Sequence, residues 1–181
     1  MKQWFALSAI GRDRPGIVAD LSELIYECDC NLEDSSMTIL GSEFAVLLLL
    51  TGETADISAR LSDACKRLEW EKRLTVFFRP LEAEPIPYRA SHQASRYALQ
   101  AVGVDKAGIV AKLTRCLADH RVNVAQMQTQ SRREPESGTP IYTLRLLMDV
   151  PADVAPQTLR ECLEVVAGEL CVDLTLDPAD E

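Results

Sequence analysis

Residues 5–31 read FALSAIGRDRPGIVADLSELIYECDCN, and residues 97–123 read YALQAVGVDKAGIVAKLTRCLADHRVN. The two stretches align without a gap at a constant offset of 92, and 11 of the 27 aligned residues are identical. Self-similarity of this kind indicates that one structural unit occurs twice in the chain. The chain of 181 residues is long enough for two small domains. We therefore expect a first domain at residues 1–80, a linker at 81–95 and a second domain at 96–181.

Each copy predicts a strand followed by an amphipathic helix. Residues 3–10 form a short apolar run that ends at Gly11, which is typical of a buried strand. Over residues 17–28 the apolar side chains recur with the helical period, and acidic side chains lie on the opposite face. We expect Pro15 in the first helical turn, where its missing N–H has no partner to lose, and Asp13 as the helix cap.

The remainder of each copy predicts a hairpin, a second helix and a closing strand. In the first copy these elements fall at residues 31–40, 43–51, 57–68 and 74–78. The elements of the second copy are a strand at 96–103, a helix at 108–120, a hairpin with its loop at 134–139, a helix at about 155–167 that ends at Gly168, and a strand at 171–176. The order βαββαβ predicts an α+β fold, with two ferredoxin-like domains whose antiparallel sheets carry helices on one face.

The charge and hydropathy patterns exclude two classes of function. The formal net charge is −9, and the acidic excess is shared by both copies. A protein that binds nucleic acid directly usually carries a basic stripe, so we expect no direct contact with DNA. The longest apolar run, Phe44–Leu50, has seven residues, whereas a membrane span needs about twenty. Because charged residues at 12–14 interrupt the apolar start and no cleavage site follows, we expect a cytoplasmic protein without membrane contact.

The cysteines and histidines indicate no metal and no catalysis. Six cysteines are scattered through apolar segments, so we expect reduced and mostly buried thiols. Cys28 and Cys30 have the spacing CxC instead of the CxxC of common zinc and redox sites, so we expect no metal there. Of the two histidines, His92 lies in the linker and His120 at a helix end, and neither has an obvious nucleophile beside it. We therefore expect neither a catalytic residue nor a cofactor.

The turn between the first strand and the first helix of each copy is the feature that suggests ligand binding. We call these turns the elbows, and they span Gly11–Val18 and Gly103–Val110. The N-terminus of a helix presents unpaired amides that bind an anion, and a glycine in the elbow lets a ligand approach. A free amino acid fits, because its ammonium could meet Asp13 or Asn31, which we expect beside the elbow. The same residues also make a good turn and cap, so a purely structural role stays open.

The motif DRPGIV after a strand, the N-L or N-V start of the second strand and the order βαββαβ resemble the ACT domain, a small-molecule-binding regulatory module. The tandem of two such modules, with the stretch GRDRPGIVADLSELIYECDCNLEDSSMTILGSEF, resembles the glycine cleavage system transcriptional repressor family over roughly residues 3–79 and 96–177. This resemblance implies a regulator without catalytic activity that senses an amino acid, glycine or serine as first guesses, and acts through a LysR-type transcription factor. It implies that the ligand-binding residues are Asp13, Arg14, Pro15, Gly16, Ile17 and Asn31 in the first copy and Asp105, Lys106, Gly108, Ile109 and Asn123 in the second.

Two other functions stay open on the sequence. One is a protein-interaction adaptor without a ligand, since the second strand of each sheet should lie at the sheet edge and exposed edges pair with other strands. The same edges leave a homodimer open. The other is a regulatory subunit of an enzyme of amino-acid metabolism. Enzymes that carry ACT-type modules need a further catalytic domain, and the two copies with their linker account for all 181 residues.

Overall fold

The computed structural model describes residues 2–86 and 94–179. The chain forms two compact units, Met1–Pro87 and Tyr88–Glu181, which we call the first and the second module. Residues 87–93 of the linker expected at 81–95 lie outside the described residues, and so does His92. The linker's two ends belong to strands, because the first module closes with a strand that reaches Leu81 and the second opens with one that begins at Ala94.

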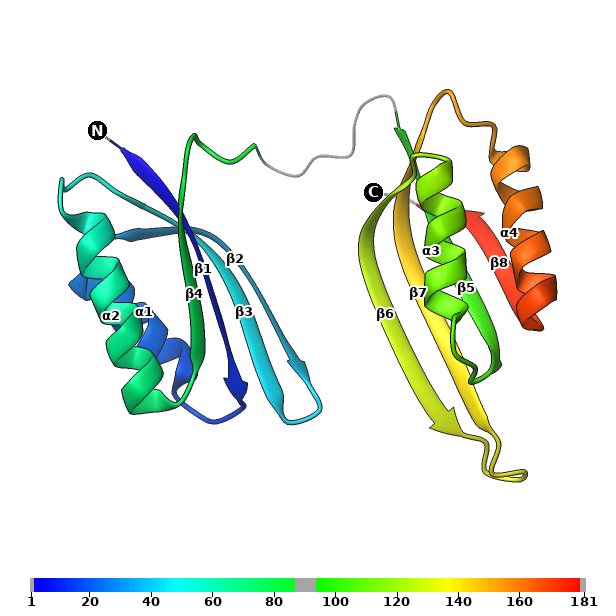
Figure 1. The fold of residues 1–181 in the computed structure, drawn as a ribbon, viewed down its shortest axis with the longest axis horizontal. Helices are drawn as coiled ribbons and strands as arrows, with labels where there is room; N and C mark the ends of the chain where they lie inside the picture. The colour runs from blue at the N-terminus through cyan, green and yellow to red at the C-terminus, as the bar shows by residue number, and fades with distance from the viewer. Residues whose placement is uncertain (1, 87–93, 180–181) are drawn as a thin grey trace. The chain divides into compact units, whose positions relative to one another are not determined.

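The first module has the expected order βαββαβ. Its elements are β1 (Gln3–Arg12), α1 (Ile17–Glu27), β2 (Asn31–Leu40), β3 (Glu43–Gly52), α2 (Ile57–Lys72) and β4 (Thr75–Leu81). The four strands form one antiparallel sheet in the order β2-β3-β1-β4, and both helices cover one face of it (Figure 1). The predicted α+β fold is therefore confirmed, and β2 lies at the sheet edge.

The second module repeats this arrangement. Its elements are β5 (Ala94–Val104), α3 (Ile109–Asp119), β6 (Asn123–Arg133), β7 (Pro140–Pro151), α4 (Pro156–Leu170) and β8 (Val172–Pro178). The strand order β6-β7-β5-β8 is that of the first sheet, and the pairing is again antiparallel (Figure 1). The repeat in the sequence is thus a repeat of a complete folding unit.

Each module has its own apolar core between the sheet and its helices. In β1 the alternate residues Phe5, Leu7 and Ala9 are buried, as the two-residue period of a strand requires. They pack in one cluster with the apolar side of α1 and α2, which includes Leu21 and Leu61. The second core is built in the same way from β5, β7 and the helices α3 and α4. The two cores fix the face of each sheet on which the helices lie.

The structure corrects three local expectations. The helix expected to end at Gly168 continues to Leu170, and Cys171 ends it in the left-handed conformation with φ of 54°. Pro15 lies in the turn before α1, because the helix begins at Ile17. Asp13 is not the helix cap, since the N-cap residue is Gly16 and no side-chain hydrogen bond caps this helix within the described chain.

The cysteines also depart from the expectation of reduced thiols. Cys116 on α3 and Cys162 on α4 form a disulfide, with their Cα atoms 6.7 Å apart. Two facing helices bring these residues together although 46 positions separate them, which no local sequence pattern indicates. Cys28, Cys30 and Cys65 of the first module are free and buried, as expected, and Cys171 is free and exposed.

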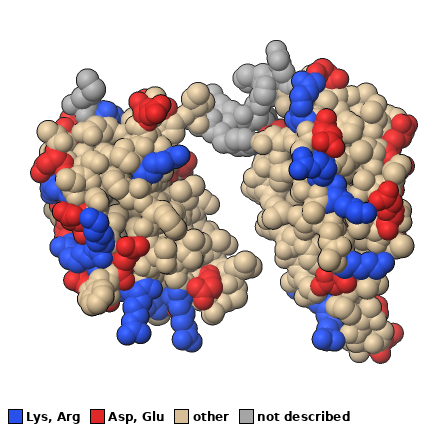
Figure 2. All heavy atoms as spheres, viewed as in Figure 1, with Lys and Arg blue, Asp and Glu red and all other residues tan. Residues whose placement is uncertain are grey.

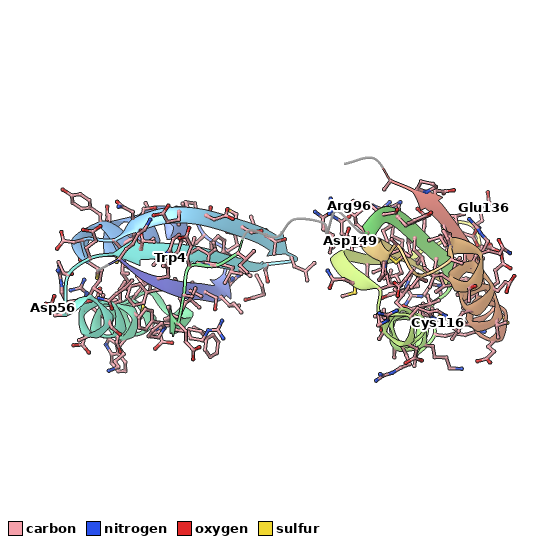
Figure 3. The ribbon with its side chains drawn as sticks, turned by 90° about the horizontal axis from the view of Figure 1, so that it is seen from above. Trp4, Asp56, Arg96, Cys116, Glu136 and Asp149 are labelled. Carbon is pink, nitrogen blue, oxygen red and sulfur yellow. A yellow bond between two sulfur atoms is a disulfide. The ribbon has the colours of Figure 1, made fainter. Side chains whose placement is uncertain are left out.

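The second module contains a buried carboxylate, that of Asp149. Asp149 on β7 is paired in register with Arg96 on β5, and the Arg96 Nε donates a hydrogen bond to Asp149 Oδ1 at 3.1 Å. The two residues lie beside each other in Figure 3. This pairing satisfies a charge that would be costly to bury alone.

No helix in the described part of the chain is long and apolar enough to cross a bilayer.

Candidate functional site

The two elbows have the same backbone geometry. Gly16 immediately precedes α1 with φ of 90°, and Gly108 precedes α3 with φ of 97°. L side chains rarely adopt this conformation, so it explains why a glycine occurs at this position in both copies. A Cβ atom on Gly108 would meet nothing within 4 Å, and one on Gly16 would meet only Arg14 Nη1 at 3.8 Å. The space in front of both glycines is therefore open.

The amides that follow each glycine point out of the helix without a side-chain cap. Neither α1 nor α3 has a capping hydrogen bond from its N-cap residue, which is glycine in both cases. Such first-turn amides carry a partial positive charge and attract anions. Ile17 and Ile109, which were expected to line the site, have buried side chains, so they can offer a ligand only their backbone.

Asp13 and Asp105 hold the elbows against the neighbouring hairpin. The Asp13 amide donates to the carbonyl oxygen of Ser42 at 2.8 Å, and the Asp105 amide donates to that of Pro140 at 2.9 Å. The two carboxylates differ, because Asp105 Oδ2 accepts a hydrogen bond from Ser131 Oγ at 2.8 Å. Asp13 is exposed, and its side chain has no hydrogen bond or ion pair with any residue in the described ranges. Only the first elbow therefore presents a carboxylate with no internal partner.

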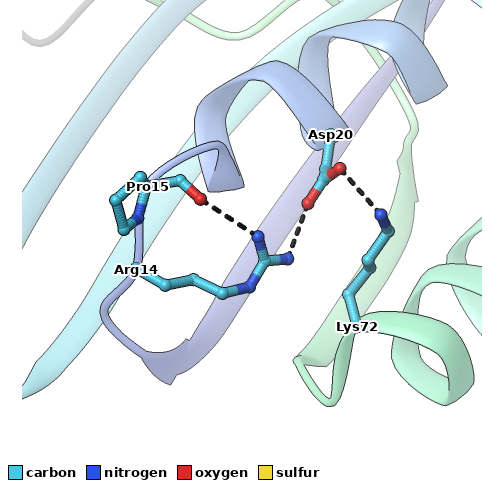
Figure 4. Close-up of polar contacts among 4 residues, drawn as sticks. All are labelled: Arg14, Pro15, Asp20 and Lys72. Carbon is cyan, nitrogen blue, oxygen red and sulfur yellow. Dashed lines mark hydrogen bonds and ion pairs between the residues drawn. The ribbon is translucent and has the colours of Figure 1, made fainter.

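Arg14 is directed along α1, where it belongs to a three-residue ion-pair network (Figure 4). Arg14 Nη2 donates to Asp20 Oδ2 at 2.6 Å, and its Nη1 donates to the carbonyl oxygen of Pro15 at 3.2 Å. Lys72 Nζ of α2 lies 3.0 Å from Asp20 Oδ1. The hydrogen bond from Arg14, followed by that from Lys72, lowers the pKa of Asp20 below its usual range. Contacts of Arg14 and Pro15 within the first module thus brace the first elbow.

The second elbow lacks this brace. Lys106 and Lys112 stand where the first copy has Arg14 and Asp20, so two cations replace an ion pair. Lys112 Nζ instead lies 3.0 Å from Glu169 Oε2 on α4. Each module therefore has an ion pair between its two helices. The acidic residue lies on the first helix in the first module and on the second helix in the second module. Lys106 makes no ion pair with any residue that the structure describes.

Asn31 and Asn123 lie at the other end of their sheets from the elbows. Asn31 is paired with Thr51, which faces Trp4 near the start of β1, whereas the elbow includes Arg12 at the end of β1. Arg12 lies eight positions after Trp4 along the strand, which corresponds to about 26 Å. Asn123 at the start of β6 occupies the same position in the second sheet. The expectation that Asn31 lies beside its own elbow is wrong, because β2 runs towards the elbow and not away from it.

The first glycine of each elbow has a packing role. A Cβ atom on Gly11 would lie 2.6 Å from Leu74 Cδ2, and one on Gly103 would lie 2.7 Å from Val172 Cγ1. Leu74 immediately precedes β4, and Val172 is the first residue of β8, so both contacts come from the start of the last strand of a module. Gly11 and Gly103 are therefore required for close packing within the module.

Sequence reasoning missed the residues that shape the elbows from a distance. Ser42, Lys72 and Ser131 come from the hairpins and from α2, and no motif joins them to the elbow. The sequence contained one sign that Asp20 has a charged partner: the second copy has Lys112 at the position of Asp20, so the charge there is reversed. That substitution predicts that any partner of this position must also change sign between the copies.

Two βαββαβ modules, each with an open glycine elbow at the start of its first helix, define a tandem α+β protein with one candidate ligand site per module. The ACT-domain family model matches residues 3–79. The first module, which these residues form, belongs to this family.

Known proteins resemble the chain over most of its length or over about half of it. The glycine cleavage system transcriptional repressor of Escherichia coli (strain K12) is 24% identical over 170 residues, which cover 93% of this chain and 86% of that protein. A UPF0237 protein of Methanopyrus kandleri is 35% identical over 88 residues, which cover 48% of this chain and 93% of that protein. The crystal structure of a protein from Galdieria sulphuraria has a TM-score of 0.76 at 26% identity, and covers 99% of this chain and 100% of that one.

Proposed function

We propose that the chain is a non-catalytic regulatory protein that binds a small free amino acid at the first elbow. The observation that carries this proposal is the position of Asp13, whose unpartnered carboxylate lies three residues before an uncapped helix N-terminus. The amides after Gly16 would bind the ligand's carboxylate, and Asp13 would bind its ammonium. In the second elbow the Asp105 carboxylate already accepts a hydrogen bond from Ser131 Oγ. We therefore expect the second site, with Lys106, Gly108 and Ile109, to bind the amino acid more weakly.

The elbow favours a small ligand, glycine or serine. Asn31 and Asn123 lie far from the elbows of their own modules, so they do not contribute to a ligand bound there. Within one module the site then consists of backbone amides and one carboxylate. Such a site recognises the groups that all amino acids share, and it offers a long side chain little to bind.

The regulatory output would be a contact with a protein, in the cytoplasm. The relative from Escherichia coli (strain K12) is a glycine cleavage system transcriptional repressor, which supports repression of the same genes. The net charge of −9 opposes direct DNA binding, and Figure 2 shows acidic and basic side chains interspersed on the visible face of each module. A LysR-type transcription factor would therefore supply the DNA contact. A ligand shifts such a contact only if it binds the free and partner-bound forms with different affinity.

Thermal unfolding of the full chain with each common amino acid tests the sensor. A ligand at one hundred times its dissociation constant should stabilise the first module by about 2.7 kcal/mol. We expect Asp13→Ala to remove this response without altering the fold, since the Asp13 side chain is exposed. The matched control is Asp105→Ala in the second elbow, which should leave the first response unchanged. The proposal is overturned if no amino acid stabilises the chain, or if Asp13→Ala responds like the wild type.

A second function, association through the sheet edges, is favoured by the exposure of β2. Every residue of β2 is exposed, and Met37 and Ile39 are each about half exposed although their partners on β3, Val46 and Phe44, are buried. Met127 on β6 repeats this pattern in the second module. An open apolar edge fits a homodimer or an adaptor that pairs with a partner's strand.

Light scattering and the variant Met37→Lys test this second function. Strand pairing predicts a concentration-dependent dimer that the lysine substitution dissociates while the far-UV spectrum stays unchanged. A monomer at high concentration would exclude self-pairing. Binding to a purified amino-acid-metabolism enzyme, with a change in its rate, would instead favour the role of a regulatory subunit.

A further inference from the structure

The helix pair of the second module carries three metal-binding side chains close together. Cys116 lies on α3 (labelled in Figure 3), and His120 lies four residues further on, at the C-cap of this helix. Cys162 faces them from α4. Residues four apart lie on the same face of a helix. The two sulfur atoms and a ring nitrogen of His120 lie within 4.8 Å of one another. In residues 2–86 and 94–179 no other group of three histidine, cysteine or acidic side chains is this close.

The backbone holds the histidine in a form suited to metal binding. His120 Nδ1 lies 2.8 Å from the carbonyl oxygen of Cys116, and since a carbonyl oxygen can only accept a hydrogen bond, the hydrogen in this contact is on Nδ1. This tautomer leaves a lone pair on Nε2. Histidines that bind metals are usually held in this way, with the other ring nitrogen bonded to a carbonyl or carboxylate.

The cluster can be reached from solvent without opening the core. Cys116 is buried, but Cys162 and His120 are partly exposed, so an ion can enter from their side. The free cysteines of the first module are all buried, so an ion cannot reach them from solvent in this way. Burial raises the pKa of Cys30 to about 11 and that of Cys65 to about 12, so these thiols keep their protons at neutral pH.

We propose that Cys116, Cys162 and His120 bind Zn²⁺ when the chain is reduced. Two thiolates and one imidazole are ligands that zinc prefers, and a fourth position would remain open to water or an added ligand. In the structure the two sulfurs form a disulfide. A dithiol reductant transfers two electrons and two protons to it, which gives two thiols and the oxidised reductant, and Zn²⁺ then displaces both thiol protons. Zinc and the disulfide exclude each other because both use the same two sulfur atoms.

Zinc titration of the full chain tests this site. The chain is reduced with a phosphine, freed of metal under nitrogen and titrated with Zn²⁺ against a chromogenic chelator. We expect one Zn²⁺ per chain, and a Co²⁺ titration should show thiolate-to-metal charge-transfer absorption. The variant Cys162→Ser should bind more than about 100-fold more weakly. His120→Gln keeps both thiols and should also weaken binding. The matched control, Cys171→Ser, removes an exposed free thiol of the same module and should bind as the wild type does.

The wild-type chain with its disulfide intact should take up no zinc. The proposal is overturned if the reduced chain binds no Zn²⁺ at micromolar concentration. It is also overturned if Cys162→Ser and His120→Gln bind like the wild type, because zinc would then lie elsewhere. Far-UV spectra of both variants show whether a loss of binding reflects a loss of fold, and His120→Gln decides the matter if Cys162→Ser does not fold.

Discussion

Arg14 and Asp20 are joined by a hydrogen bond of 2.6 Å across the elbow of the first module, whereas lysines stand at both corresponding positions of the second. This hydrogen bond holds the Arg14 side chain, next to Asp13 in the sequence, against α1. In the second module Lys112 must find its anion on α4, where it pairs with Glu169. Two elbows with the same backbone therefore differ in their charges, which gives a physical reason for different ligand affinities.

Replacing Asp20 by Asn should destabilise the first module by about 1 kcal/mol at pH 7, a modest value because both cations are partly exposed. The folded-state pKa of Asp20 is lowered from 3.8, so the unfolded chain binds the proton first as the pH falls. The stabilisation is complete above about pH 5, roughly one unit above the unfolded-state pKa, and is lost as the pH falls through the unfolded-state and then the folded-state pKa. Urea unfolding of both proteins from pH 7 to about pH 3 should show the difference shrinking at the acidic end. A difference that stays constant with pH would contradict the ion-pair network.

Two glycine-to-alanine substitutions should have opposite effects. Gly16→Ala places a Cβ on a residue with φ of 90° and should destabilise the first module by about 1 kcal/mol. Gly168→Ala lies inside α4 with nothing within 4 Å of the added atom, and should stabilise the second module by about 0.5–1 kcal/mol. Chemical unfolding measures both changes. Equal effects of the two substitutions would contradict the assigned helix boundaries.

Reducing the disulfide should destabilise the second module and leave the first unchanged. The bridge joins residues 46 positions apart, and closing a loop of that length restricts the unfolded chain by about 4 kcal/mol on the chain-entropy argument. Thermal unfolding in chelator, with and without a reductant, measures the change. Cys162→Ser should reproduce the reduced value, and Cys171→Ser should not. A fall in the stability of the first module would show that the bridge does not act within its own module.

The purified chain should not retard DNA in a gel at moderate salt. Neither half of the sequence is net positive, so little phosphate charge can be neutralised. A mixture with a LysR-type transcription factor bound to its operator should migrate more slowly than the factor alone. Tight binding of DNA by the chain alone would overturn the charge argument.

The sequence by itself determined the repeat and, through it, the fold. Periods of two and of 3.6 residues set the faces of strands such as β1 and helices such as α1, and both are local properties that can be read along the chain. The glycine elbows could also be recognised in the sequence. A residue in the left-handed conformation before a helix is usually a glycine, which is again a local property. The helix end at Gly168 was misplaced because a single glycine does not stop a helix whose neighbours pack into the core.

Only the tertiary structure decided which side chains meet. Strand direction removed Asn31 from its own elbow, and the packing of α2 against α1 brought Lys72 to Asp20. The facing of α3 and α4 joined Cys116 to Cys162 and placed His120 beside them, although each residue alone appeared unremarkable in the sequence. Contacts between residues 46 or more positions apart depend on how whole elements pack, so no local pattern of residues contains them.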